Sequence, residues 1–551
     1  MSYLQKIILS LLLYSFAAAQ EGDNTNVSEP AADADDLFAE MQIEKKSAAG
    51  SNTARCLELN GKHKFLLRIP FLEGKTALDG KMKAPGFRNS LGFNYNKNNI
   101  TVISELQFDF FMHKGGDWDE LTDFKVLENA IYRNADKLTI GAGYQFYTWG
   151  SADEQNPTDN LNPLDYSLGP DAEKIPLLSV SLNYFPSRKI NIETVLAPYS
   201  QAALLPLDIA EEIPEAVFNK NLISSVYTNP ANTNLLGLPK TWSVAAEDKQ
   251  VTTRAPAYKL HSGLAGARIS FFTKAADFSV SYLYDLDPFY TPVITLQRYL
   301  AADLSNIDFP FSNNYTNAYS YRVQKIALKR KRVHRLGCDL RFSAGPLGLW
   351  AEACYSITED LKLDNYKIRN HDLSWTAGFD TDLGNRDQHY LNFQYYGRFI
   401  PAYYHSFYKD YPEGQPQPEK SGDKKYMEKY YYRMFTDRAA LYTEGLLQAI
   451  AVYLDLSFKN GKYQPHLALS YQLPRQYDQQ AGTRYGGLFL NPEVNIAPAD
   501  SFHILLGANY YRSFYKEKGS SKIKNNEQTQ MGLFNKDSAA YIKFTYEWFS
   551  K

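Results

Sequence analysis

The feature that most constrains this chain is a rhythm of about eighteen segments of apolar/polar alternation, joined in turn by a short link and a long one. The last segment, Ala540–Phe549, is apolar on one side at Ile542, Phe544, Tyr546 and Trp548, and polar on the other at Lys543, Thr545 and Glu547. Such a strand suits a wall between lipid and a wet lumen. The rhythm therefore predicts an all-β fold, a transmembrane antiparallel up-and-down β-barrel of about eighteen strands (range about 16–20).

The order of the links adds a second constraint. Short links are expected at 96–99, 134–136, 186–188, 274–276, 344–346, 384–388, 459–462 and 497–501, and long ones near 150–176, 198–259, 286–321, 359–372, 400–445, 473–484 and 513–539. Bacterial outer-membrane barrels have short periplasmic turns and long outer loops, so we expect an even strand number and both termini in the periplasm. A soluble sandwich or propeller is the competing interpretation, but it gives no reason to sort links by length.

Composition excludes other classes of protein. Charged residues make up 22% of the 551 residues and the mean hydropathy is −0.43. Beyond the N-terminus no apolar stretch approaches the roughly 18 residues that a spanning helix needs, so a helical membrane bundle is excluded. The formal net charge of −2 gives no electrostatic basis for binding nucleic acid.

The N-terminal region predicts export. Lys6, the apolar stretch Ile7–Phe16 and Ala17–Ala19 form a secretory signal peptide over residues 1–19. A retained anchor helix is the alternative, but the apolar stretch is too short to span a membrane. Residues 20–60 are acidic and poor in aromatics, which predicts a largely disordered periplasmic lead-in with one short helix at 35–46. The barrel is expected to occupy residues 61–551, with clear alternation from Lys64.

The three cysteines do not form a disulfide scaffold. Cys338 shares a strand face with Leu336 and Leu340, whereas Cys354 shares one with Glu352. Cross-strand partners must point to the same side of a sheet, so no bond is expected between Cys338 and Cys354.

A basic run, Lys329–Arg332, lies within a segment from Arg322 to Phe342 whose apolar/polar alternation is unbroken. We call the assignment of alternate residues to one face of a strand its phase, and this phase stays constant over the segment. The phase predicts one long strand whose outer half rises above the hydrocarbon and carries Arg330 and Arg332 to lipid head groups or surface glycans. Steering of solutes at the pore mouth is the functional alternative to a merely solvated face.

The sequence contains no complete motif of a catalytic or metal site. Gly141-Ala142-Gly143 begins like a dinucleotide loop, but Phe146 replaces the third glycine and the context is a strand. There is no H-E-x-x-H, no G-x-S-x-G and no cysteine pair at metal spacing. We therefore expect no enzymatic activity, no cofactor and no metal.

Phase also predicts which side chains face the lumen. The candidates are Arg68, Glu105, Asp109, Gln145, Tyr147, Trp149, Glu193, Arg268, Asp285, Arg335, Asp339, Arg341, Glu352, Asp380, Asp382, Arg398, Asp455, Glu493, Lys543 and Glu547. A ring of one charge sign would indicate ion selection. The mixture of signs indicates either a hydrated passage for polar solutes or internal salt bridges that brace the wall.

One stretch carries more than periodicity: Gly143-Tyr144-Gln145, Trp149-Gly150, Asp153, Asn162-Pro163-Leu164-Asp165 and Lys174-Ile175-Pro176. This strand-loop-strand signature resembles poorly characterised porin-like families of bacterial outer-membrane barrels. Trp149 and Gly150 would let the chain leave the wall tightly, and Asn162, Pro163 and Asp165 would fold the loop through Asx-type turns. With Asp153, these residues form a candidate constriction loop, and a loop packed on the rim is the alternative.

The leading hypothesis is a porin-like channel, monomeric or homotrimeric, that passes small hydrophilic solutes by diffusion and contacts outer-membrane lipid. Insertion by the barrel-assembly machinery is expected, although Ser550-Lys551 follow the usual terminal aromatic. One alternative is a surface adhesin or antigen that works through loops 198–259, 286–321 and 400–445. Another is a transporter of amphipathic or hydrophobic compounds, for which the phases offer only patches such as Leu447, Ala449, Ala451 and Tyr453.

Overall fold

The computed structural model describes residues 57–70, 85–111, 122–152, 155–166, 172–204, 250–253, 262–300, 319–384, 389–401, 423–429, 432, 445–478, 483–516 and 538–550. The predicted signal peptide, most of the lead-in with its helix at 35–46, most of loops 198–259 and 400–445, and residues 301–318 of loop 286–321 lie outside these residues. Within them, no helix is long and apolar enough to cross a membrane.

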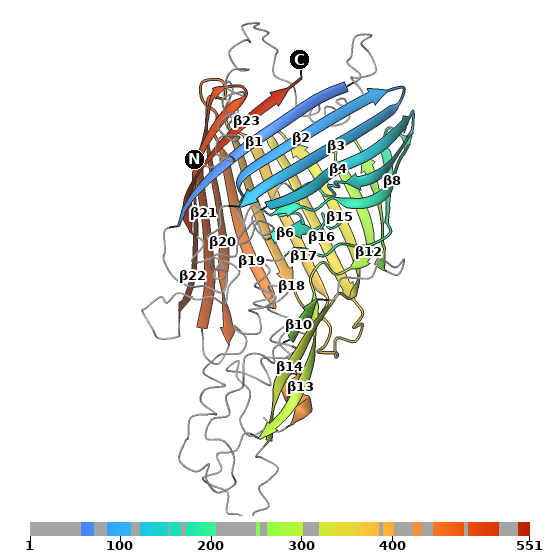
Figure 1. Ribbon diagram of the computed structural model, residues 1–551, viewed down its shortest axis with the longest axis vertical. Coiled ribbons are helices and arrows are strands. Elements are labelled where there is room, and N and C mark those ends of the chain that lie inside the picture. The colour runs from blue at the N-terminus through green and yellow to red at the C-terminus, as the bar shows by residue number, and fades with distance from the viewer. Residues whose placement is uncertain are drawn as a thin grey trace, which may run out of the picture. The chain divides into compact units, whose positions relative to one another are not determined.

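Eighteen strands form one closed antiparallel barrel. They are β1 Leu57–Pro70, β2 Pro85–Lys97, β3 Ile100–Phe111, β4 Thr122–Ala135, β5 Leu138–Gln145, β8 Leu177–Ser187, β9 Ile190–Ala197, β11 Leu264–Phe272, β12 Asp277–Leu286, β15 Arg332–Ala344, β16 Leu347–Thr358, β17 Asp372–Asp382, β18 Tyr390–Phe399, β19 Leu446–Asp455, β20 Tyr463–Asp478, β21 Thr483–Ala499, β22 Phe502–Lys516 and β23 Ala539–Phe549. Each strand pairs with the next in this order, and β1 closes the ring on β23 (Figure 1). The predicted all-β barrel with an even strand number is confirmed.

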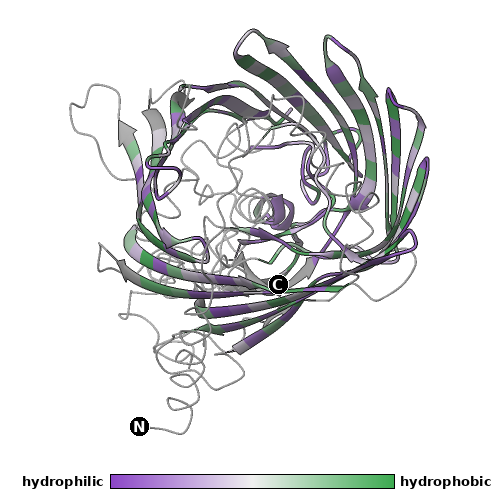
Figure 2. Ribbon diagram, turned by 90° about the horizontal axis from the view of Figure 1, so that it is seen from above, coloured by the Kyte–Doolittle hydropathy of each residue, from purple (hydrophilic) through white to green (hydrophobic). Residues whose placement is uncertain are grey.

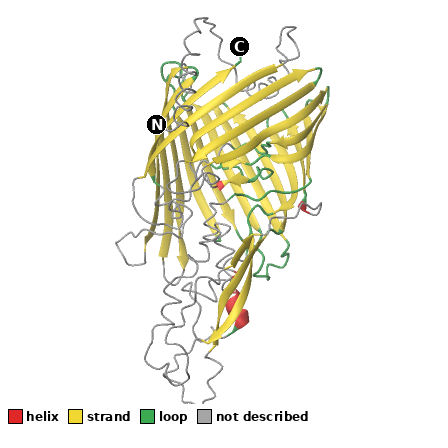
Figure 3. Cartoon of the chain, viewed as in Figure 1, coloured by secondary structure: helices red, strands yellow, loops and turns green. Residues whose placement is uncertain are grey.

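The short links turn the chain where the sequence places them. Asn98 and Asn99 connect β2 and β3 with positive φ values of 50° and 64°, and Gly345 connects β15 and β16 with φ 64°. Asparagine and glycine tolerate this left-handed region, so these residues permit two-residue hairpins. Figure 3 shows the resulting arrangement, in which strands dominate the described chain.

Three predicted boundaries are wrong. β1 begins at Leu57, so residues 57–60 belong to a strand rather than to the lead-in. The strand expected to reach Trp149 ends at Gln145, where the chain leaves the wall. The long connection expected over 473–484 is mostly strand, because bulges let β20 continue to Asp478 and β21 begin at Thr483.

The single strand predicted for Arg322–Phe342 is also wrong. It is divided into β14 Tyr319–Lys329 and β15, and β14 belongs to a separate three-stranded sheet with β10 Gln250–Thr253 and β13 Thr291–Leu300. The break falls at Arg330, whose guanidinium donates to the carbonyl oxygens of Ser200 (2.7 Å), Leu286 (2.8 Å) and Asp287 (2.6 Å). Arg330 is therefore bound to backbone instead of to head groups or glycans.

Arg332 does not extend the strand outward either. Its guanidinium donates to the carbonyl oxygen of Gly263 at 2.6 Å and lies over the ring of Tyr284, 4.6 Å from the centroid. Burial among the neighbouring groups lowers the pKa of Arg330, which lies between the two sheets, although Asp285 and Asp287 oppose the shift. The basic run therefore holds chain segments together.

The two faces of the wall differ in chemistry. Large apolar side chains such as Leu196, Val280 and Leu336 are exposed on one face, while Asp109 and Gln394 are buried on the other. In Figure 2, hydrophobic and hydrophilic residues alternate along the strands of the ring. Cys338 is exposed and Cys354 is buried, and both are free thiols, in agreement with their opposite phases.

The Asn98–Asn99 turn makes a test of the hairpin geometry. Asn98→Val should lower the free energy of unfolding by about 1–2 kcal/mol, because a β-branched residue is strained in the left-handed region. Asn98→Gly, the matched control, should change it little. Urea unfolding of the refolded barrel, followed by tryptophan fluorescence, measures both variants, and equal stability of the two would contradict the turn.

Candidate functional site

The connection between β5 and β8, residues 146–176, is called the inward segment, because its described residues run inside the barrel. Side chains that contact it come from β16 and β18 on one side and from β2 and β4 on the other. Between β5 and β18 there are seven wall strands in one direction and nine in the other. Because the contacting side chains lie on the polar inner face, the segment can reach them only through the interior. Residues 153–154 and 167–171 of the segment, including Asp153, lie outside the described residues.

Asn162 fixes the base of the inward segment. Its side-chain oxygen accepts the N–H of Tyr147 at 2.7 Å, and its amide donates to the carbonyls of Gln145 (3.1 Å) and Ile175 (2.9 Å). These bonds join the end of β5 to the stretch that leads into β8. Asn162 therefore closes the loop at its base instead of forming the Asx-type turn that the sequence predicts.

Trp149 holds the first part of the segment against the wall. It is buried in an apolar cluster within the barrel whose other members are Leu161, Leu177, Val195, Ala197, Leu264 and Leu283. Only 2% of its surface is exposed, so it packs inside the cluster rather than lining open space, unlike the sequence prediction. A large aromatic side chain contributes most when it is buried in this way.

The turn after Trp149 depends on Gly150 and Asn156. Gly150 has φ 101°, and a Cβ there would approach Thr158 Oγ1 and the Asn156 amide within 2.4–2.6 Å. The side-chain oxygen of Asn156 accepts the N–H groups of Thr158 (3.1 Å) and Asp159 (3.0 Å). The Asx-type turn of the segment is thus at Asn156, a residue that the signature does not include.

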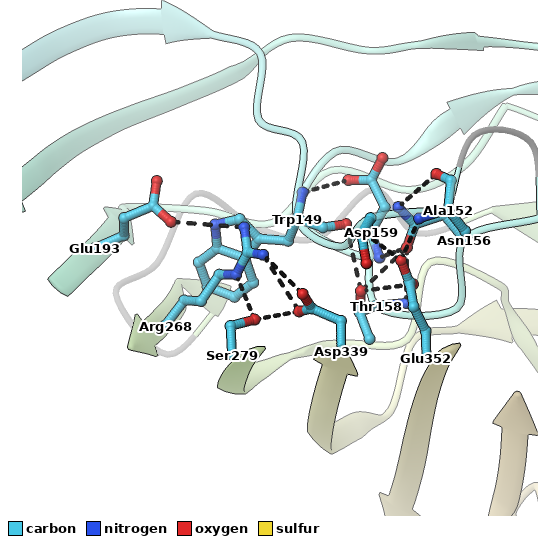
Figure 4. Close-up of polar contacts among 11 residues, drawn as sticks. Trp149, Ala152, Asn156, Thr158, Asp159, Glu193, Arg268, Ser279, Asp339 and Glu352 are labelled. Atoms are coloured by element: carbon cyan, nitrogen blue, oxygen red, sulfur yellow. Dashed lines mark hydrogen bonds and ion pairs between the residues drawn. The ribbon is translucent and has the colours of Figure 1, made fainter. Parts of the chain in front are cut away.

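Two inner-face side chains of the wall bind the middle of the segment, and Figure 4 shows the first of them, Glu352. Glu352 of β16 accepts the N–H groups of Ser151 and Ala152 and, at 2.9 Å, the hydroxyl of Thr158. Gln394 of β18 accepts the N–H of Gln155 at 3.2 Å. The phase of β16 marked Glu352 as an inward residue, and that of β18 could have marked Gln394. No local pattern indicates that their partners are backbone groups of a distant loop.

The returning part of the segment is tied to the other side of the wall by ion pairs. β6 (Leu164–Asp165) and β7 (Glu173–Lys174) form a small hairpin. Asp165 pairs with Lys125 of β4 at 2.9 Å, and Glu173 pairs with Arg88 of β2 at 2.5 Å. Asp165 therefore acts as an ion-pair partner rather than as a turn former, and Pro163 is buried beside it.

Lys174 pairs within the segment, with Asp159 at 2.5 Å. Burial raises the pKa of Asp159, although Lys174 opposes the shift. The folded chain therefore takes up a proton at Asp159 at a higher pH than the unfolded chain, so this group favours folding at low pH and loses that contribution as the pH rises through its folded pKa. The ion pair with Lys174 is lost on acidification earlier than that of an ordinary aspartate would be.

Many of the other predicted lumen residues are bound to side chains of the wall. Arg268 of β11 donates to Asp339 of β15 at 3.2 Å and to Ser279 Oγ at 2.9 Å, and Glu193 lies 3.8 Å from it (Figure 4). Further contacts join Arg88 to Asp109 (2.7 Å), Arg341 to Asp380 (3.8 Å), Tyr147 to Ser179 (2.7 Å), Gln145 to Ser181 (2.7 Å), Glu493 to Tyr541, Asp455 to His466, and Glu547 to Lys62. Apart from the contact of Tyr147, which belongs to the inward segment, these contacts brace wall strands that are adjacent or one strand apart.

The remaining predicted lumen residues differ in how deeply they are buried. Asp285 and Arg335 are buried, Glu105 and Arg398 are half-buried, and Asp382 is exposed at the end of β17. Lys543 Nζ lies 5.5 Å from the ring centroid of Tyr541. The side chain of Arg68 is outside the described part of the chain. Among the described residues, no group of three or more His, Cys, Asp or Glu side chains could hold a metal ion.

Comparison with protein-family models and with curated proteins finds no match. Among solved structures, the chain is similar to Pseudomonas aeruginosa OpdK with vanillate (8% identity, 90% of this chain and 98% of that chain covered, TM-score 0.44). It is also similar to Acinetobacter baumannii OccAB4 (10%, 90% and 98%, TM-score 0.44). A third is Escherichia coli Wzi, an outer-membrane carbohydrate-binding β-barrel involved in group 1 capsule assembly (9%, 94% and 89%, TM-score 0.41). At these identities the likeness concerns the fold alone.

Truncation of Trp149 tests the apolar attachment of the inward segment. Trp149→Ala should lower the free energy of unfolding by about 3–5 kcal/mol, because it leaves a cavity between the segment and the wall. Trp375→Ala, at a partly exposed position of β17, is the control and should cost less. Denaturant unfolding measures both, and a smaller loss for Trp149→Ala than for the control would contradict the cluster.

Proposed function

We propose that this protein is a porin-like channel of the bacterial outer membrane that passes small hydrophilic solutes by passive diffusion. The observation that carries the proposal is the division of the closed wall into an apolar outer face and a polar inner face. An apolar outer belt is stable only against lipid, and a ring of eighteen strands encloses enough space for an aqueous passage.

The inward segment is proposed to form the constriction of this passage. It leaves the wall after Gln145, reaches β16 and β18, and returns past β4 and β2, where Asp165 and Glu173 are paired. A segment attached on both sides narrows the lumen to a set width. The paired charges along the inner wall favour solutes that are polar without a strong preference for either sign of charge.

The same proposal assigns the membrane contacts, the route of insertion and the orientation of the chain. Outer-membrane lipid contacts the exposed apolar side chains, the barrel-assembly machinery inserts the chain, and both termini lie in the periplasm with the long loops outside. The channel works as a monomer or as a homotrimer. The N-terminal residues 1–19 act as the signal peptide and are removed on export.

An arginine on the outer face tests contact with lipid. Val280→Arg on β12 should lower the free energy of unfolding from lipid by about 2–4 kcal/mol, because a charge near the bilayer midplane is poorly solvated. Leu383→Arg, in the β17–β18 link, is a matched control, since both native side chains are 52% exposed. Folding titrations in lipid vesicles measure the difference, and equal effects of the two changes would exclude a lipid-facing β12.

Conductance tests the channel itself. The purified full-length protein, inserted into a planar lipid bilayer, should produce stepwise increases in current with a weak preference for either ion in a salt gradient. Vesicles that contain the protein should take up small sugars and amino acids faster than protein-free vesicles. Confirmed insertion without conductance steps at any voltage would disprove the channel.

A further inference from the structure

The wall alone does not explain why a carboxylate is present at position 352. In the β15–β16 ladder Glu352 lies directly opposite Asp339, so two carboxylates are neighbours on the inner face. Like charges in that position destabilise a sheet. Asp339 is neutralised by Arg268, whereas no described cation lies within ion-pair distance of Glu352. A stable wall would be easier to build without this charge.

The inward segment supplies what Glu352 lacks. Only 3% of the Glu352 surface is exposed, and its carboxylate accepts two successive backbone N–H groups, of Ser151 and Ala152, together with the Thr158 hydroxyl. Buried N–H groups need acceptors, and a strand partner is not available to a loop that has left its sheet. Hydrogen bonds to a charged acceptor are stronger than bonds between neutral groups.

We propose that Glu352 is the positioning residue that latches the inward segment to the wall and thereby sets the width of the constriction. This inference rests on the proposed channel function and deepens it. When the latch is broken, Ser151, Ala152 and Thr158 leave β16, and the passage widens. The Trp149 cluster and the ion pairs of Asp165 and Glu173 retain the two ends.

A native thiol reports on the latch. Cys354 follows Glu352 on the same face of β16, and only 3% of its surface is exposed. The side-chain amide of Asn160 lies 3.6 Å from its Sγ, so the inward segment covers it. Displacement of the segment uncovers Cys354 to reagents dissolved in the lumen.

The experiment measures how fast a small hydrophilic maleimide labels Cys354 in the full-length barrel in lipid vesicles. Cys56→Ser and Cys338→Ser remove the other thiols. Glu352→Gln keeps the shape of the side chain but removes its charge, so the oxygen that accepts both the Ser151 and the Ala152 N–H groups becomes a weaker, neutral acceptor. It should raise the labelling rate about tenfold or more, in line with the strength of hydrogen bonds to a charged group. Its single-channel conductance should also increase.

Two further variants separate release of the segment from other effects. Glu493→Gln removes an inner-face carboxylate of β21 that is bonded to Tyr541 rather than to the segment, and it should label at the wild-type rate. Thr158→Val leaves the Glu352 charge in place and removes one hydrogen-bond donor to it, so it should also raise the labelling rate of Cys354. Because the charge near Cys354 is unchanged in this variant, the increase cannot come from an altered reactivity of the thiol. Heat-modifiable gel migration confirms that each barrel is folded.

Equal labelling of wild type, Glu352→Gln and Thr158→Val would overturn the latch, and so would faster labelling in Glu352→Gln alone. If Glu352→Gln does not fold, Thr158→Val decides the question by itself. A wild-type barrel without conductance whose labelling still responds to both variants would disprove the channel and leave the latch intact.

Discussion

The structure depends on the need of every strand for hydrogen-bond partners on both sides. No strand of the wall has a free edge, because β1 pairs with both β2 and β23. Closure of this kind is the condition for strands to stand in hydrocarbon, where an unpaired N–H or C=O group has no water to bind. It also divides each strand into an outer and an inner face, since successive side chains point to opposite sides.

The same need explains the inward segment. Once the chain leaves β5 it has no ladder, and its backbone groups must be bound by side chains. Asn162, Asn156, Glu352 and Gln394 take this role, and each lies on the inner face or in the segment itself. Charged pairs such as Arg88 with Glu173 hold the returning part. The polar inner wall is therefore the binding surface of a loop as well as the proposed lining of a passage.

Much of the fold could be predicted from local sequence, since both alternation and turn chemistry are local. The period of two identifies wall strands such as β15 and β16, and turn formers such as Asn98 and Asn99 identify hairpins. Phase cannot show where a strand stops, however. The alternation of Arg322–Phe342 continues across Arg330, whose bonds to the carbonyl oxygens of Ser200, Leu286 and Asp287, all distant in sequence, mark the break.

The candidate site was less predictable for the same reason. The signature around Trp149 and Asn162 identified the right segment. It predicted Asx-type turns at Asn162 and Asp165, however, whereas the observed Asx-type turn is at Asn156. The bonds from Ser151 and Ala152 to Glu352 join residues about two hundred positions apart. No local rule relates them, because they result from the curvature of the whole ring.

The central claim is that the described residues of the inward segment lie within the barrel, with Ser151, Ala152 and Thr158 against the inner face of β16. Asn160 and Cys354 provide the most direct measurement, since their side chains are in contact. Asn160→Cys, in a protein without Cys56 and Cys338, places a second thiol beside Cys354. After mild oxidation of the folded barrel in lipid, mass spectrometry should find a disulfide between positions 160 and 354 within one chain. A folded barrel in which both thiols stay free, or bond only between chains, would contradict the account.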